Sequence, residues 1–181
     1  MSCKAFPIQS YPFSATDSLL IDTNIWLFIY GPQADPNDWK TKLYSENFKR
    51  ILLAKSSIFV DVLILSEFIN RYSRIEFNKQ KSNTGPKEFK TFRKSPAFPP
   101  VAKAIAEDAR RILKHCRPAG SEFESLDLNN LLAFLEKECA DFNDLILAEL
   151  CQKNNWKMIT HDGDFKNFGI TILSANRTLL S

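Results

Sequence analysis

The stretch SLLIDTNIW, residues 18–26, decides the fold, because one apolar run ends at Asp22 and another begins after Asn24. The first run is typical of a buried strand. The second run continues to Tyr30 and is typical of the start of a helix. Asp22 therefore falls where a strand passes into a helix, and polar side chains at such junctions gather at one edge of a parallel sheet.

Strand-like and helix-like segments alternate along the rest of the chain. The expected helices run from Asp35-Pro36 through Ala54, from Ser66 onward, over 99–116, along the leucine stripe 128–135 and over 141–154. The expected strands cover 58–62, 156–160 and 170–173, with turns at 83–86 and 161–165. Because parallel neighbours need helical crossovers, this alternation predicts an α/β sandwich around a parallel sheet. At 181 residues, the chain fits a single domain, residues 1–181.

The composition is that of a globular protein, with 44% hydrophobic and 25% charged residues. The four cysteines form no CxxC pair and no spacing typical of zinc, which predicts free thiols in a reducing compartment. The first residues do not have the pattern of a secretion signal, and no apolar run is long enough to cross a bilayer. We therefore expect a soluble, cytoplasmic protein with no membrane partner.

The net charge of +3 is too mild to identify a polyanionic partner, but the charge is unevenly distributed. Residues 71–94 contain eight basic side chains against two acidic ones, Glu76 and Glu88; the basic ones are Arg71, Arg74, Lys79, Lys81, Lys87, Lys90, Arg93 and Lys94. A basic stretch apart from an acidic cluster suits an enzyme that acts on a phosphate polymer. It equally suits an ordinary solvated helix and loop.

Four acidic residues, Asp22, Glu67, Asp144 and Asp162, fall at strand ends or at expected helix starts. The carboxyl ends of parallel strands meet at one edge, which brings Asp22, Glu67 and Asp162 together; Asp144 joins them if its helix starts near that edge. Clustered carboxylates repel one another unless a cation binds between them. Mg²⁺ and Mn²⁺ prefer such oxygen ligands and can activate water for phosphodiester hydrolysis.

Each acid also has a simple structural interpretation. Asp22 could cap a helix, Glu67 could interact with a helix dipole, and Asp144 could face solvent. Asp162 and Asp164 flank a glycine and could form a turn. The residues alone leave the structural and the metal-binding interpretations about equally favoured.

Four motifs resemble those of the PIN-domain nucleases, among which the VapC-type toxins are the most familiar. The motifs are LLIDTNIWL (19–27), LSEF (65–68), DFNDLILAELC (141–151) and MITHDGDF (158–165). The resemblance covers most of the chain in order and spacing. It implies a three-layer α/β/α sandwich with a central, mainly parallel sheet, a Mg²⁺ or Mn²⁺ cofactor, and RNA as the usual substrate.

The resemblance also assigns roles to residues. It implies that Asp22, Glu67, Asp144 and Asp162 are the catalytic and metal-binding acids, with Asp164 as an extra ligand through water. It implies that Thr160 and Asn24, or Thr23, support the acids through hydrogen bonds. For Asp141, which lies three residues before Asp144, we favour a simple charge at a helix N-terminus over a role in the site.

The expected activity is metal-dependent hydrolysis of RNA that leaves a 5′-phosphate and a 3′-hydroxyl. Flanking phosphates would be neutralised by Arg71, Arg74, Lys79 and Lys81. The neighbouring aromatic residues Phe77, Phe89 and Phe92 could stack on bases, but we favour packing in the core. As partners we expect an antitoxin protein, if the chain is a toxin, and a second copy in a homodimer. The segment of about 74–124 is longer and more basic than in small toxins, which points to a different RNA or a different partner.

Three alternatives differ in chemistry. The first is a PIN module that binds RNA or a protein without cutting; the presence of all four acids argues against it. The second is a phosphotransferase with an aspartate nucleophile, which requires a second aspartate where Asn24 stands. The third is a nucleotide-binding α/β protein, for which the chain has neither a GxGxxG nor a Walker loop.

Overall fold

The computed structural model describes residues 3–81, 86–120, 123–138 and 140–181. Six parallel strands form one sheet in the order β1-β6-β5-β2-β3-β4. The strands are β1 (Lys4–Pro7), β2 (Ser18–Ile21), β3 (Ser57–Val60), β4 (Arg117–Pro118), β5 (Lys157–Ile159) and β6 (Thr171–Ser174). The fold is the α/β/α sandwich with a parallel sheet that was predicted.

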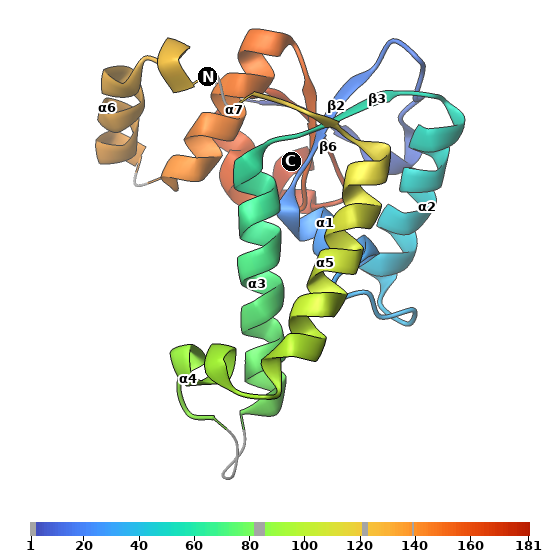
Figure 1. Cartoon of the computed structure of the whole chain (residues 1–181). Coiled ribbons are helices and arrows are strands. Elements are labelled where there is room, and N and C mark those ends of the chain that lie inside the picture. Colours follow the sequence, from blue (N-terminus) through green and yellow to red (C-terminus); the bar gives the residue numbers. More distant parts are fainter. Residues whose placement is uncertain (1–2, 82–85, 121–122, 139) are drawn as a thin grey trace.

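Helices surround this sheet and connect its strands (Figure 1). The α-helices in the described residues are α1 (Thr23–Ile29), α2 (Trp39–Leu53), α3 (Val62–Gln80), α4 (Phe89–Lys94), α5 (Phe98–His115), α6 (Leu128–Glu138), α7 (Phe142–Asn154) and α8 (Arg177–Leu180). Short 3-10 helices are η1 (Ile8–Ser10), η2 (Phe123–Ser125) and η3 (Gly163–Asn167). None of the helices in this described part combines the length and the apolar composition that a bilayer crossing requires.

The strand order changes direction between β2 and β5, which are neighbours in the sheet. From β2 the chain moves to β3 and β4 on one side, and from β5 it moves to β6 on the other. Since parallel crossovers are right-handed, opposite directions of travel send the connections to opposite faces. A crevice therefore opens beyond the carboxyl ends of β2 and β5, where α/β proteins usually bind ligands.

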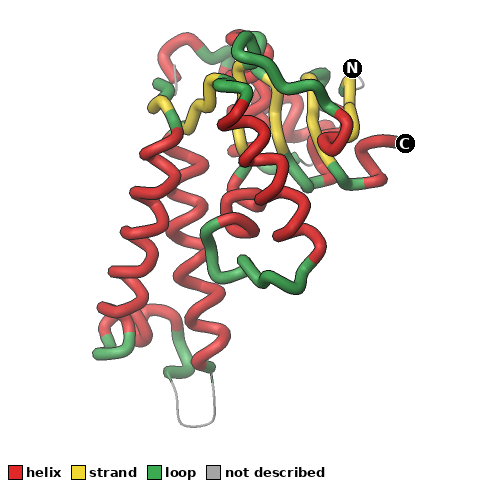
Figure 2. Tube along the Cα trace, turned by 90° about the vertical axis from the view of Figure 1, so that its right-hand side faces the viewer, coloured by secondary structure: helices red, strands yellow, loops and turns green. Residues whose placement is uncertain are grey.

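Helices α3 and α5 lie side by side and extend beyond the sheet as an arm, with α4 at its far end (Figures 1 and 2). An aromatic cluster closes this end: the ring of Phe92 is fully buried and lies 5.6 Å from Phe77 and 5.5 Å from Phe98. The ring of Phe89 lies 5.7 Å from Phe77. The expectation that these phenylalanines pack in the core rather than offer stacking surfaces is confirmed.

Several expected boundaries are wrong. The helix expected at Asp35-Pro36 begins at Trp39, because Asp35 accepts a hydrogen bond from the Asn37 backbone and closes a turn there. The strand expected to reach Val62 ends at Val60. Asp61 then caps α3 through the Leu63 N–H at 2.7 Å, so this helix starts four residues before the expected Ser66.

Several elements were not expected from the sequence, among them β1, β4 and α8. β1 and β4 are edge strands, and β4 has only two residues, Arg117 and Pro118, so neither has a long apolar run. The turn expected over 83–86 falls largely on residues 83–85, which lie outside the described residues.

Candidate active site

Asp22 occupies the junction between β2 and α1, where it is 5% exposed. Its carboxylate accepts hydrogen bonds from the Thr23 N–H at 2.6 Å, from the Thr160 hydroxyl at 2.6 Å and from the side-chain amide of Asn24. Burial raises the pKa of Asp22 to about 6, and the charges of Glu67 and Asp162 act in the same direction, while the hydrogen bonds oppose the rise. The capping role expected of Asp22 is real, but the capped end also holds this carboxylate in the crevice.

Thr160 connects the ends of β2 and β5. Besides donating to Asp22, its hydroxyl oxygen accepts hydrogen bonds from the Asp162 N–H at 2.9 Å and from the Asn24 amide at 3.2 Å. The Asn24 carbonyl in turn accepts from the His161 N–H at 3.2 Å. Thr160 and Asn24 therefore contact the acids in the way that was expected of supporting residues.

Thr23 contributes differently from these two residues. Its backbone N–H binds Asp22, but its hydroxyl donates to the Ile64 carbonyl in α3 at 3.3 Å. This bond joins the first turn of α1 to the first turn of α3. Glu67 then lies in the second turn of α3 rather than in the first turn, where it was expected. Because the helix starts early, the helix dipole is not the reason for a glutamate at this position.

The carboxylate of Glu67 accepts a hydrogen bond from the Arg71 guanidinium at 3.0 Å, one turn further along α3. Both side chains are partly exposed, so this ion pair adds little to stability. The ion pair instead positions the Arg71 guanidinium at the edge of a group of carboxylates.

Asp144 lies in the first turn of α7, which starts at the crevice. Asp141 caps this helix by accepting a hydrogen bond from the Asn143 N–H at 2.8 Å. Burial, together with the charges of the neighbouring acids, raises the pKa of Asp144 to about 8; these acids are Asp22, Asp141, Asp162 and Glu67. Asp141 therefore lies at the helix N-terminus, as was favoured for it, and it also lines the site.

Asp162 lies three residues beyond the end of β5 and caps η3, accepting a hydrogen bond from the Asp164 N–H at 3.1 Å. The turn expected at this position is present. Because the cap uses one carboxylate oxygen and faces the same crevice, the structural and the chemical interpretations of Asp162 are compatible.

A cavity of about 270 Å³ brings these side chains together. Its lining consists of Asp22, Glu67, Arg71, Asp141, Asn143, Asp144, Asp162 and Asp164. We call it the acidic cavity. Asn143 was not expected in it, although its place in the motif around Asp144 could have suggested this.

The atoms of the acidic cavity that could ligate a metal are the oxygens of its six carboxylates and of the Asn143 amide. Oxygen atoms are the ligands that Mg²⁺ and Mn²⁺ prefer. Burial and the charges of neighbouring carboxylates raise the pKa values of Asp22 and Asp144, so ionising these groups together costs free energy. Within the described residues, no three His, Cys, Asp or Glu side chains lie as close together as a directly ligated metal needs. The donor chemistry fits a hard cation, and Mg²⁺ commonly retains several waters between itself and the protein.

The basic residues expected to bind nucleic acid divide into two groups. Arg71 lines the acidic cavity. Arg74 lies over the ring of Phe89 at 4.9 Å in the arm, and Lys79 pairs with Glu76 at 2.8 Å. Lys81 follows the last residue of α3. Lys79 is twelve residues beyond Glu67, about 18 Å along the helix, so Lys79 and Lys81 lie away from the cavity. Arg74 is not among the residues that line it.

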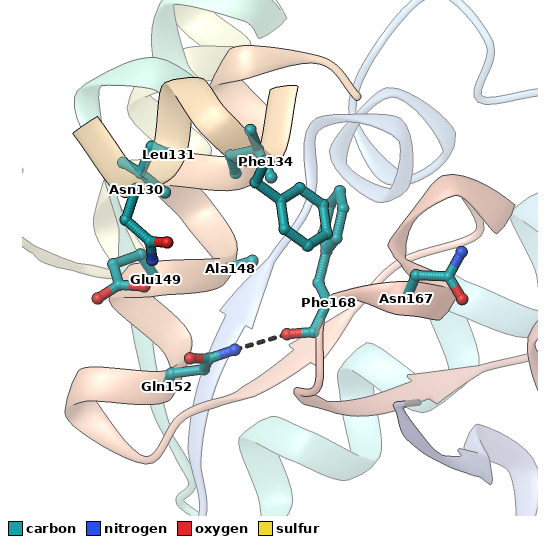
Figure 3. A pocket seen from close by; sticks show the side chains of 9 residues that line it. Asn130, Leu131, Phe134, Ala148, Glu149, Gln152, Asn167 and Phe168 are labelled. Carbon is teal, nitrogen blue, oxygen red and sulfur yellow. Dashed lines mark hydrogen bonds between the residues drawn. The ribbon is translucent and has the colours of Figure 1, made fainter. Parts of the chain in front are cut away.

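A second cavity, of about 190 Å³, lies between α6, α7 and η3 (Figure 3). Leu131, Phe134 and Phe168 supply much of its surface, and the Gln152 amide donates a hydrogen bond to the Phe168 carbonyl. Its lining contains none of the four expected acids. All four of these acids line the acidic cavity instead.

These observations define a class of protein: an all-parallel α/β fold in which carboxylates surround a crevice at the strand ends. A family model described as PIN domain matches residues 19–170. The chain belongs to the PIN-domain family, whose members are generally nucleases, and the resemblance noted in the sequence is confirmed.

Two solved structures share the fold. VapBC2 from Rickettsia felis, solved bound to a DNA fragment from its promoter, contains a chain that is 15% identical, with a TM-score of 0.55 and coverage of 87% of this chain and 98% of that one. PAE2754 from Pyrobaculum aerophilum is 11% identical, with a TM-score of 0.54 and coverage of 94% and 92%. No curated protein sequence matches the chain.

Proposed function

We propose that this protein is a metal-dependent endoribonuclease that hydrolyses phosphodiester bonds in the acidic cavity. The observation that carries the proposal is the convergence of Asp22, Glu67, Asp144 and Asp162 on one cavity at the strand ends, with raised pKa values for two of them. Carboxylates held together at such a cost in free energy are typical of a functional site.

Mg²⁺ or Mn²⁺ would be held by Asp22, Asp144 and Asp162, with Asp164 acting through water. Such an ion supplies charge neutralisation at phosphorus and a more acidic bound water. Glu67 would bind a second ion or orient the attacking water. Attack of this water on phosphorus would break the bond from phosphorus to the 3′ oxygen and leave a 5′-phosphate and a 3′-hydroxyl. Thr160 favours the ionised form of Asp22 by donating a hydrogen bond to it, against the effect of burial.

RNA is the substrate that we propose. Arg71 at the cavity would neutralise the phosphate beside the scissile bond, which requires the guanidinium to be shared between Glu67 and the substrate. Arg74, Lys79 and Lys81 would contact a longer RNA along the arm. Each of these is a single positive charge, so their contributions to binding would depend on salt.

The decisive experiment replaces Asp144 with Asn and measures both Mn²⁺ binding by calorimetry and cleavage of RNA. We expect the variant to lose Mn²⁺ binding and cleavage while it stays folded. Glu149→Gln is the matched control, because it removes one carboxylate from the same helix but outside the acidic cavity. Full activity in Asp144→Asn would reject the proposal, and RNA binding without cleavage by the native chain would favour the non-cutting module.

We further propose that the chain pairs with an antitoxin and forms a homodimer. This rests on family membership and on the fold shared with a chain of the VapBC2 structure. Co-expression with the product of an adjacent small reading frame should give a stable complex with reduced cleavage. Light scattering of the isolated protein should give twice the mass of 20.8 kDa; a single-chain mass would reject the homodimer.

A cytoplasmic location is proposed from the cysteines. Cys3, Cys116 and Cys151 are free thiols in the structure, as a reducing compartment would maintain. Fractionation of cells that produce the protein should recover it with cytoplasmic markers.

A further inference from the structure

Trp39 is a large aromatic side chain that remains 52% exposed at the first turn of α2. It is not a loosely attached surface residue, because its ring contacts the ring of His161 at 5.7 Å and 67°. The ammonium group of Lys40 lies 5.9 Å from the same ring. The indole is therefore held in place, has a cation beside it, and still offers much of its surface to a ligand.

His161, on which Trp39 rests, is itself fixed by hydrogen bonds. Its Nδ1 lies 2.8 Å from the Tyr44 hydroxyl, and that hydroxyl accepts a hydrogen bond from the Ala175 N–H at 3.2 Å. The phenol proton is thus available for Nδ1 of the histidine. Such a chain fixes the orientation of the imidazole, and through it the position of Trp39.

The platform formed by Trp39 and His161 adjoins the acidic cavity through the backbone. His161 directly precedes Asp162, and its N–H donates to the Asn24 carbonyl, whose amide group binds Asp22. One peptide unit therefore separates a residue of the platform from a residue of the acidic cavity.

A surface hollow of about 620 Å³ lies next to the indole. Its lining consists of Gln9, Trp39, Lys42, Leu43, Glu46, Asn47 and Arg50. Arg50 donates hydrogen bonds to the Gln9 and Tyr11 carbonyls at 2.8 and 2.7 Å, so part of the lining is firmly braced. A hollow of this size is within the range that holds small organic groups.

We propose that Trp39 is a stacking subsite for an unpaired nucleobase of a single-stranded RNA whose neighbouring phosphate occupies the acidic cavity. This inference rests on the proposed nuclease function and adds to it a preference for unpaired substrate. Every nucleobase has a flat π-face, so stacking on an indole requires no particular sequence. Lys40 and Lys42 beside the ring supply positive charge for the phosphates on either side. Bases in a duplex are already stacked on one another and cannot reach such a ring.

The test compares the binding of a fluorescein-labelled ten-nucleotide RNA, single-stranded or as a duplex, in an Asp144→Asn background that prevents cutting. We expect Trp39→Ala to weaken single-strand binding about 5- to 100-fold and to leave duplex binding unchanged. Trp39→Phe, which keeps a ring, should bind within about threefold of the parent. The matched control is Leu53→Ala, which removes a side chain that is 83% exposed at the far end of the same helix.

Equal binding of single strands by the parent and by Trp39→Ala would overturn the subsite, as would an equal loss for single strands and duplexes. Equal binding together with a change from dimer to monomer in Trp39→Ala would assign the indole to a protein interface instead. Cleavage of RNA by the native chain is measured separately. Cleavage without an effect of Trp39 rejects only the subsite, whereas an effect of Trp39 without cleavage rejects only the nuclease.

Discussion

At the scale of the residue, Thr160 joins several groups of the acidic cavity through a single atom. Its single hydroxyl donates to Asp22 and accepts from Asp162 and Asn24, so one oxygen links the carboxylates that follow β2 and β5. The side chain is fully buried, and each of these bonds lacks a replacement from water.

Thr160→Val should therefore destabilise the fold by about 1–3 kcal/mol and weaken Mn²⁺ binding. The isosteric change leaves the Asp162 N–H without its acceptor and removes a hydrogen bond that lowers the pKa of Asp22. Urea unfolding and calorimetric titration measure the two effects. Thr160→Ser retains the hydroxyl and should preserve metal binding; equal losses in both variants would mean that the methyl group, not the hydroxyl, matters.

Asp144→Asn should stabilise the metal-free protein at neutral pH while it abolishes Mn²⁺ binding. The native side chain has a pKa raised to about 8, so folding removes a carboxylate from water and brings it among others. An amide of nearly the same shape has no such cost. We expect a higher midpoint in urea for Asp144→Asn than for the native protein in EDTA, and an unchanged midpoint for Glu149→Gln.

At the scale of the element, the C-terminal end of α2 contains a residue whose backbone conformation is unfavourable for its type. Lys55 follows the C-cap Ala54 with φ of 57°, in the left-handed region that favours glycine. At the end of α7 the corresponding residue is Asn155, with φ of 53°, and asparagine tolerates this conformation better than lysine.

Lys55→Gly should consequently stabilise the protein by about 0.5–1 kcal/mol, because relief of the strained backbone exceeds the extra freedom of glycine in the unfolded chain. The midpoint of urea unfolding measures this change. Lys55→Ala removes the same charge but retains a Cβ, so it should bring no gain. A similar gain from both variants would point to the charge rather than to the backbone.

At the scale of the whole molecule, stability should depend on pH and on metal together. Asp22 and Asp144 have pKa values of about 6 and about 8 in the folded protein, against about 3.8 when unfolded. Between these values the folded state binds more protons than the unfolded state, so the free energy of unfolding falls as pH rises from about 4 to about 8.

Thermal unfolding in EDTA should therefore give a lower midpoint at pH 8 than at pH 5, and Mn²⁺ should raise the midpoint more at pH 8, where more of the carboxylates are ionised. The Asp144→Asn variant should show a smaller decrease between these pH values and no response to Mn²⁺. A native midpoint that rises with pH in EDTA would contradict the mutual repulsion of the acids.

Much of this protein could be predicted from sequence, because the determining patterns are local. The buried strands β2, β5 and β6 follow from short apolar runs, and the helices α5 and α7 follow from their apolar spacing and end signals. Each of these runs is followed by a turn or a capping residue. The four acids could be named because the motifs around them resemble those of a known family.

The tertiary structure decided what depends on contacts between distant segments. β1 and β4 exist because β6 and β3 offer free edges for pairing, not because of their own apolar content. Glu67 reaches the acidic cavity from a second helical turn, since Asp61 starts α3 early. Placement of Arg71 at the carboxylates, of Asn143 in the cavity and of Trp39 upon His161 required the three-dimensional packing. Local propensity acts over a few residues, whereas a site at the ends of strands is assembled by a sheet whose neighbours lie more than a hundred residues apart in the chain.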